Sequence, residues 1–151
     1  DAAGAARTMT TVAFHHAFPV KAPLEATTRF YCDVLGAGKG RVADGVWQDF
    51  DFFGHQVVAH VVKDDFFAAR AGTNHVDGHN VPVPHFGAVL KWDDFDAFVA
   101  RLRRHNVKFE IEPYLRFAGQ PGEQRTCFLL DPSGNALEFK CFKNTASLFA
   151  T

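Results

Sequence analysis

The sequence predicts an α+β domain built from two tandem modules, each with the order β-α-β-β-β. In each half of the chain, segments with alternating apolar residues flank one segment whose apolar residues have helical spacing. The two halves also match in length: His15 and His85 lie 70 residues apart, and the first helical residues, Leu24 and Phe95, lie 71 apart. A single repeat of this length indicates two modules packed as a pseudo-symmetric pair.

Composition limits the function classes. The 151 residues are 47% hydrophobic and 22% charged, enough for one domain with a buried core. With 16 Lys and Arg against 17 Asp and Glu, the chain has no excess of positive charge that would favour binding to nucleic acid. No apolar run approaches the roughly 18 residues of a membrane-spanning helix. Three cysteines without CxxC spacing indicate free thiols, so we expect the cytoplasm or another reducing compartment; an organellar location after N-terminal trimming is also compatible.

The first module is expected over 12–62, after a flexible lead-in over 1–11. Its elements are a strand over 12–20, a helix over 24–35, a Gly-rich loop to residue 45, and strands over 46–53 and 56–62. Gly36 stands where a helix C-cap glycine belongs. On the first strand His15 faces one side of the sheet and His16 the other.

An irregular linker is expected over 63–81, followed by the second module over 82–143 and a C-terminal tail over 144–151. The second module repeats the order, with a strand over 84–90, a helix capped by Asp93 or Asp94, and strands over 107–111, 125–130 and 136–142. The residues DPSGN at 131–135 are turn formers that reverse the chain between the last two strands.

Glu138 lies shortly after this turn, between apolar neighbours. Burying an unpaired carboxylate costs several kcal/mol or more, so this residue either binds something or lies near a sheet edge. An edge-strand carboxylate facing water is the simpler explanation, and Lys140 on the same face favours it. We nevertheless interpret Glu138 as a metal ligand, because the repeat offers histidines at matching places.

Four positions form the expected site: His15 and His85 on the first strands of the modules, and His60 and Glu138 on the last strands. His60 and Glu138 each lie an even number of residues after the first residue that follows the preceding turn. Both side chains are therefore expected on the same face of the strand as that first residue. Gln56 on the same face and His55 in the turn are alternatives to His60. Imidazole and carboxylate donors suit one divalent ion of Fe, Mn, Co, Ni or Zn.

The segments HHAFPV, FYCDVLG, PHFGAVLKWDDFDAF and DPSGNALEF resemble the vicinal oxygen chelate superfamily, which includes glyoxalases, bleomycin resistance proteins and extradiol dioxygenases. WQDFDFFGHQVVAH and VPVPHFG are similar to the branch of the cyclitol (valiolone-type) epimerases. The resemblance covers about 14–143. It implies a cupped, mostly antiparallel mixed sheet around a divalent metal ion, which chelates two adjacent oxygens of a substrate. The implied ligands are His15, His85 and Glu138, with His60 chosen as the fourth.

With four ligands we expect an isomerase, an epimerase or a lyase that acts on a small oxygenated metabolite through an enediolate. The candidates for the general base are Glu123, Tyr114 or the ligand carboxylate of Glu138. With three ligands, His15, His85 and Glu138 form the facial triad of an Fe(II) extradiol-type dioxygenase. A third alternative is a non-catalytic protein that binds a small molecule. Neither nucleic acid nor a membrane is expected as a partner, and the resemblance implies a homodimer.

Overall fold

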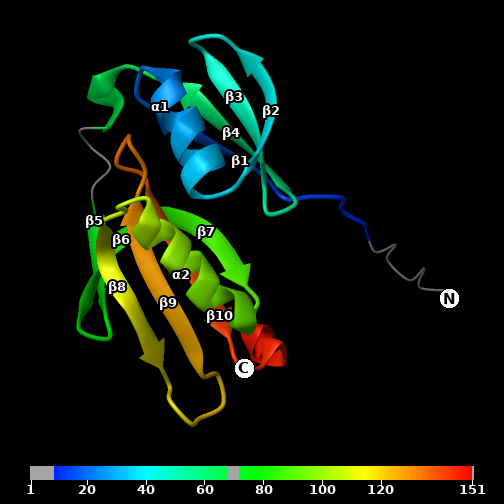
Figure 1. Ribbon diagram of the computed structural model, residues 1–151, viewed down its shortest axis with the longest axis vertical. Helices are drawn as coiled ribbons and strands as arrows, with labels where there is room; N and C mark the ends of the chain where they lie inside the picture. Colours follow the sequence, from blue (N-terminus) through cyan, green and yellow to red (C-terminus); the bar gives the residue numbers. More distant parts are fainter. Residues whose placement is uncertain (1–8, 68–71, 151) are drawn as a thin grey trace, which may run out of the picture.

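The computed structural model, which describes residues 9–67 and 72–150, contains two four-stranded sheets and one two-stranded sheet. The two larger sheets form the body of the fold. Their strand orders are β1-β4-β3-β2 and β7-β10-β9-β8, one sheet in each module (Figure 1). The first and last strands of each module pair in parallel, and the other neighbours pair antiparallel. The predicted α+β class with mixed, mostly antiparallel sheets is confirmed.

The first module contains β1 (His15–Val20), α1 (Leu24–Arg29), the π-helical turn η1 (Phe30–Val34), β2 (Gly38–Ala43), β3 (Trp47–Phe52) and β4 (His55–Val61). Gly36 ends the helical stretch with a φ of 83°, as expected of a C-cap glycine. The loop predicted up to Gly45 is largely a strand instead. Gly40 on this strand packs closely on β3, since a Cβ there would lie 2.9 Å from Cβ of Asp49. Gly40 therefore serves the close packing of β2 on β3 rather than a loop.

The second module contains β7 (His85–Leu90), the 3-10 turn η3 (Trp92–Asp94), α2 (Phe95–Arg104), β8 (Phe109–Arg116), β9 (Gln124–Leu130) and β10 (Ala136–Phe142). The predicted strand over 107–111 starts two residues later and continues five residues further. A 3-10 helix, η4 (Thr145–Phe149), follows in the segment predicted as a tail.

The connection between the modules differs from the prediction of an irregular linker. After the short helix η2 (Asp64–Phe67), the strands β5 (Gly72–Val76) and β6 (His79–Val83) form a hairpin. Its turn residues Asp77 and Gly78 both have positive φ, at 51° and 78°, the arrangement of a tight hairpin turn. Residues 68–71 of the predicted linker and 1–8 of the predicted lead-in lie outside the described residues.

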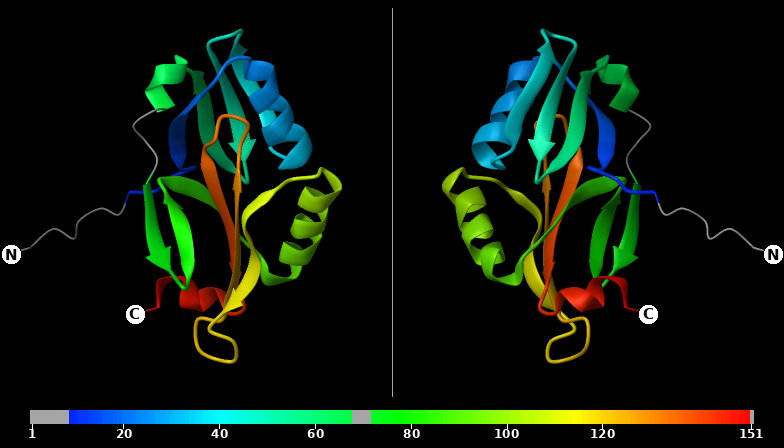
Figure 2. Two further views of the ribbon diagram at one scale, coloured as in Figure 1. Left: turned by 90° about the vertical axis from the view of Figure 1, so that its left-hand side faces the viewer. Right: turned by 90° about the vertical axis from the view of Figure 1, so that its right-hand side faces the viewer.

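Both helices lie on the same side of the two sheets, and the β5–β6 hairpin lies on the other side (Figure 2). We call the sheet surface opposite α1 and α2 the free face. One continuous core fills the helix side. Its largest fully buried side chains include Tyr31, Phe50, Phe95, Leu102, Leu129, Leu137 and Phe139, which come from both modules.

The 131–135 turn between β9 and β10 reaches from the second module into the first (Figures 1 and 2). The Tyr31 hydroxyl donates a 3.0 Å hydrogen bond to the Asp131 carboxylate. The Asn135 amide donates to the Pro19 carbonyl at 2.8 Å, and the Lys21 N–H donates to the Ser133 hydroxyl at 2.7 Å. The DPSGN segment therefore joins the modules as well as reversing the chain.

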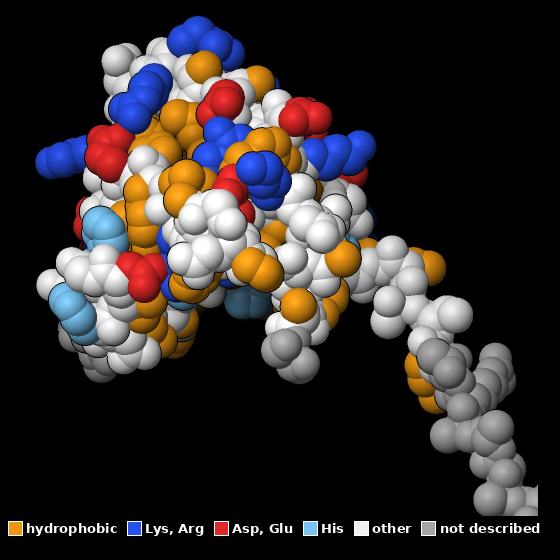
Figure 3. Space-filling model, turned by 90° about the horizontal axis from the view of Figure 1, so that it is seen from below, with side chains coloured by type: hydrophobic (Ala, Val, Ile, Leu, Met, Phe, Trp, Pro, Cys, Tyr) orange, Lys and Arg blue, Asp and Glu red, His pale blue; other side chains and the backbone are white. Residues whose placement is uncertain are grey.

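The surface mixes charged and apolar side chains. On the face shown in Figure 3, Lys and Arg lie among acidic and hydrophobic side chains. Within the described residues, no helix combines the length and apolar character needed to cross a membrane.

Candidate metal centre

Glu138 lies on a central strand of the second sheet, since β10 runs between β7 and β9. Its side chain is only 11% exposed, so the alternative of an edge carboxylate facing water is wrong. Oε1 accepts a 2.7 Å hydrogen bond from the Thr126 hydroxyl. Oε2 lies 3.2 Å from Nε2 of His85 and 3.3 Å from Nζ of Lys140.

These partners control the charge of Glu138. Burial raises its pKa, but hydrogen bonds from His85 and Thr126, together with the charge of Lys140, outweigh burial and lower the pKa to about 2. In the opposite direction, the hydrogen bond to Glu138 raises the pKa of His85 above its ordinary value. The carboxylate is therefore ionised over the whole physiological range.

His85 is held by the hairpin that connects the modules. Its Nδ1 lies 2.6 Å from the Pro82 carbonyl oxygen, which can only accept, so Nδ1 carries a proton. In the neutral ring the lone pair then resides on Nε2, the nitrogen that faces Glu138. A backbone carbonyl that fixes the tautomer in this way is the usual support of a metal-binding histidine.

Gly87 lies directly opposite Glu138 in the parallel β7–β10 pair. A Cβ at this position would come within 1.6 Å of the Glu138 carbonyl oxygen. Only glycine fits at this position, so β7 can approach β10 closely beside Glu138.

In the first module His15 and Gln56 form a second pair, although by register Gln56 matches Ala136 rather than Glu138. They face each other in the parallel β1–β4 register, and Nδ1 of His15 lies 2.9 Å from Oε1 of Gln56. Behind them, the Gln56 amide is 3.5 Å from the Asp49 carboxylate, which also accepts a 3.1 Å hydrogen bond from Arg41. Each module thus presents one imidazole beside one side-chain oxygen.

His60 is not brought beside His15. It has the predicted parity, but the register pairs it with Pro19 and Trp47. It is exposed and lies four residues beyond Gln56, roughly 13 Å along an extended strand. The other alternative, His55, accepts a 2.9 Å hydrogen bond from the Phe14 N–H through Nδ1 and projects to the helix side.

The two pairs lie on either side of the junction between β1 and β7. The Phe86 ring lies 4.8 Å from the His16 ring and 5.0 Å from the Phe18 ring on the helix side. Because side chains alternate along a strand, His15 and His85 next to these rings project to the free face. Within the described residues, no three His, Cys, Asp or Glu side chains are close enough to hold an ion. To bind one shared ion, the His15–Gln56 pair and the His85–Glu138 pair would have to come closer together.

Of the two other predicted catalytic residues, only Tyr114 lies near Glu138. It pairs with Thr126, and the charge of Glu138 is among the smaller causes that, after burial, raise its pKa. Glu123 is five residues from Phe128, the β9 partner of Glu138, and thus roughly 16 Å away along the strand. Its carboxylate binds Lys143 at 3.0 Å and the Gly119 N–H at 2.5 Å.

Thr126, Lys140 and the Pro82 carbonyl are site groups that the sequence analysis did not assign. Lys140 and Glu138 share one face of a strand, which was visible in the sequence but was interpreted as a sign of solvent exposure. Thr126 and Pro82 come from other strands, and only the register brings them to the site.

Comparison with known proteins agrees with this architecture. Residues 13–139 match the Glyoxalase/Bleomycin resistance protein/Dioxygenase superfamily. The chain belongs to this superfamily. Its members commonly use a divalent metal ion. A search of curated proteins gave no significant match.

Three solved structures illustrate the shared fold. A glyoxalase/bleomycin resistance protein/dioxygenase from Alicyclobacillus acidocaldarius is 29% identical, with 91% of this chain and 96% of that chain covered and a TM-score of 0.70. The fosfomycin resistance protein FosX from Listeria monocytogenes is 16% identical, with coverages of 92% and 98% and a TM-score of 0.65. Lactoylglutathione lyase from Agrobacterium tumefaciens is 16% identical, with coverages of 95% and 100% and a TM-score of 0.61.

Proposed function

We propose that this superfamily member is a divalent-metal-dependent enzyme acting on a small oxygenated metabolite. The observation that carries the proposal is the His85–Glu138 pair, in which a carbonyl-oriented imidazole faces an ionised carboxylate at 3.2 Å. The His15–Gln56 pair adds a second nitrogen and a neutral oxygen. Two imidazoles, one carboxylate and one amide oxygen suit Fe, Mn, Co, Ni or Zn.

In this proposal His15, Gln56, His85 and Glu138 would hold the ion, with Gln56 replacing His60. When bound, a divalent ion would supply Lewis-acid polarisation of two adjacent substrate oxygens. Thr126 and the Pro82 carbonyl keep Glu138 and His85 oriented. A tyrosine phenol is protonated at neutral pH and burial raises the pKa of Tyr114 further, so Tyr114 would donate a hydrogen bond or a proton rather than remove one.

The reaction class that this arrangement supports best is isomerisation, epimerisation or lyase chemistry through an enediolate, because four protein donors leave room mainly for a chelated substrate. An Fe(II) dioxygenase is the outcome favoured if Gln56 does not bind, since His15, His85 and Glu138 then form a facial triad. Oxygen uptake with catechols, compared with solvent proton exchange in small hydroxyketones, separates the two reactions.

The ligand set is tested by metal analysis of protein purified without chelator. We expect about one equivalent of a transition metal per chain, and an increase in Tm when metal is returned to stripped protein. Glu138→Gln and Gln56→Ala should each lower metal affinity, whereas His60→Ala, on the same strand and face as Gln56, should not.

Several results would contradict the proposal. Less than about a tenth of an equivalent, without an increase in Tm on adding Mn, Co, Ni or Zn, would exclude the metal site. Loss of metal in His60→Ala but not in Gln56→Ala would restore the ligand first expected from strand parity. The molar mass with and without the ion shows whether the two pairs close within one chain or between two copies in a homodimer.

A further inference from the structure

Lys140 is the cation beside the proposed carboxylate ligand, and the metal site gives it no role. It follows Glu138 by two residues on β10 and projects to the same free face, with Nζ 3.3 Å from Oε2 of Glu138. Its side chain is 32% exposed, so about two thirds of this lysine is withdrawn from solvent. The role of Lys140 proposed here rests on the proposed function.

In the described structure Glu138 neutralises Lys140. A carboxylate that binds a divalent ion shares its negative charge with that ion, and the ion itself repels a nearby ammonium group. An ion held by Glu138 would therefore deprive Lys140 of its partner. Because Lys140 lies in the middle of a central strand, its backbone cannot move away from the ion.

The neighbours of Lys140 offer no replacement charge. Across the sheet it pairs with Thr126 on β9 and with Val89 on β7, and Tyr114 lies beyond Thr126 on β8. None of these side chains is anionic at neutral pH. Asp77, which the hairpin brings to this face, is already engaged by Arg116 and by the Tyr114 hydroxyl.

A partly buried ammonium group without a counter-ion is costly, so an anion arriving with the substrate is favoured at this point. We propose that Lys140 binds an anionic group of the substrate, a carboxylate or a phosphate, and so selects metabolites that carry such a group next to the chelated oxygens. Nζ of Lys140 lies 3.3 Å from Oε2 of Glu138, so the anionic group would lie close to the chelated oxygens.

The inference is tested with three chelators that share one hydroxamate, a group with two adjacent oxygens. Acetohydroxamate lacks an additional charge, malonomonohydroxamate adds a carboxylate, and phosphonoacetohydroxamate adds a phosphonate at the same place. Binding to the Co²⁺-loaded protein is measured by calorimetry for the wild type, Lys140→Met and Lys140→Arg. Lys143→Met is the matched control, because Lys143 is 62% exposed and pairs with Glu123.

We expect the wild type to bind at least one of the two anionic chelators about tenfold or more tighter than acetohydroxamate. Lys140→Met should lower this ratio about tenfold while leaving the Kd of acetohydroxamate unchanged, and Lys140→Arg should retain most of the preference. The anionic chelator that binds tighter identifies the group as a carboxylate or a phosphate. Lys143→Met should behave as the wild type does.

A role limited to neutralising Glu138 would alter metal affinity without changing the preference for anionic chelators. An unchanged ratio in Lys140→Met, or an equal decrease in Lys143→Met, therefore overturns the inference. If the wild type binds Co²⁺ and all three chelators equally, only the inference fails. If it takes up no metal, or binds the metal but no hydroxamate, the proposed function fails and the inference fails with it.

Discussion

Glu138 and His85 depend on each other for their charge states in the metal-free protein. The pKa of Glu138 is lowered to about 2 and that of His85 is raised, and each is the hydrogen-bonding partner of the other. By linkage, Glu138 contributes stability above its unfolded pKa near 4.5, and this contribution is lost as pH falls toward 2. His85 contributes fully below 6.5, and this contribution is lost as pH rises through its raised pKa.

The free energy of unfolding should therefore differ most between wild type and Glu138→Gln at about pH 5 to 6.5, where both groups are charged. The difference should shrink on either side of that window. Urea unfolding in the presence of EDTA measures it. Glu123→Gln is the matched control, because its carboxylate pairs with Lys143 and not with a histidine. A difference for Glu138→Gln that stays constant from pH 5 to 9 would contradict the coupling to His85.

Single residues also show how far the sequence predicts the site. The face to which His15, His85 and Glu138 project follows from strand alternation, and their matching places follow from the repeat, so both are readable in the sequence; their binding of one ion stays a prediction. Parity cannot choose between Gln56 and His60, since both project to the free face. The choice depends on the register in which β4 pairs with β1. That parallel register places Gln56 beside His15, 41 positions away in the sequence.

Among the elements, the 131–135 turn is bonded to the first module by several hydrogen bonds. The Asp131 side chain is buried and accepts hydrogen bonds from the Tyr31 hydroxyl and the Asn135 amide, and from the backbone N–H groups of Ser133 and Asn135. Burial raises the pKa of Asp131, and these hydrogen bonds oppose the increase. The turn therefore contains a buried polar network in which all four of these donors share one acceptor, the Asp131 carboxylate.

Asp131→Ala should destabilise the protein by about 2 to 4 kcal/mol, because it leaves several buried donors without an acceptor. Tyr31→Phe removes one of the hydrogen bonds and should cost about 1 kcal/mol. Urea unfolding compares them. A cost for Asp131→Ala no greater than that for Tyr31→Phe would contradict this role. Metal content per folded chain should match the wild type, because Asp131 is not a proposed ligand.

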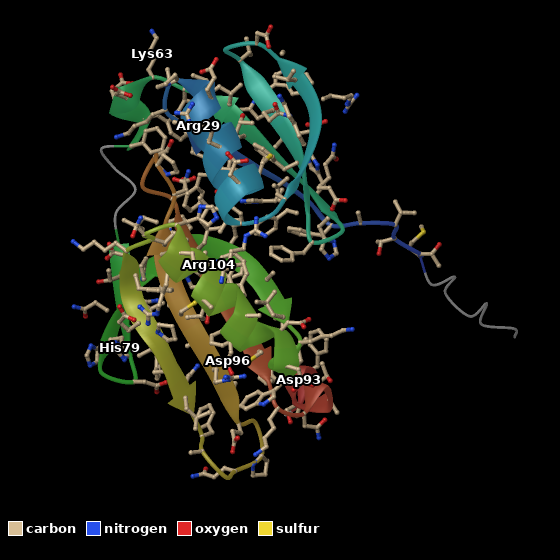
Figure 4. The ribbon with its side chains drawn as sticks, in the orientation of Figure 1. Arg29, Lys63, His79, Asp93, Asp96 and Arg104 are labelled. Carbon is tan, nitrogen blue, oxygen red and sulfur yellow. The ribbon has the colours of Figure 1, made fainter. Side chains whose placement is uncertain are left out.

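The hairpin β5–β6 takes the place of the expected irregular linker. Asp77-Gly78 is a strong hairpin signal, but the surrounding Gly72, Asn74 and Asn80 suggested an irregular loop. The hairpin supplies the Pro82 carbonyl to His85 and the Asp77 carboxylate to Arg116. His79, labelled in Figure 4, adds a ring contact of 4.7 Å to Tyr114.

At the scale of the whole molecule, Arg101 on α2 joins the two modules. Its guanidinium donates 2.8 Å hydrogen bonds to the carbonyl oxygens of Val34 and Asp33, at the end of the helical segment of the first module. These carbonyls belong to the helix C-terminus, where a cation is favourable. A Cβ added at Gly36 would lie 3.4 Å from the same guanidinium, so the glycine leaves room for it.

Arg101→Ala should lower the free energy of unfolding by about 1 to 2 kcal/mol. Arg104→Ala, an exposed arginine in the last turn of the same helix (Figure 4), should change it by less than about 0.5 kcal/mol. The urea midpoint should shift while the slope and the single transition are kept, because the core is continuous across the modules. Equal losses in the two variants, or two separate transitions, would contradict this view.

The reach of the 131–135 turn into the first module has a consequence for synthesis on the ribosome. Tyr31 and Pro19 emerge about a hundred residues before the side chains that complete their hydrogen bonds. Domains fold as units while the chain is made from its N-terminus. The first module therefore cannot form its hydrogen bonds to the 131–135 turn until β9 and β10 have left the exit tunnel. A chain truncated before the turn would expose unfinished core surface to chaperones and proteases.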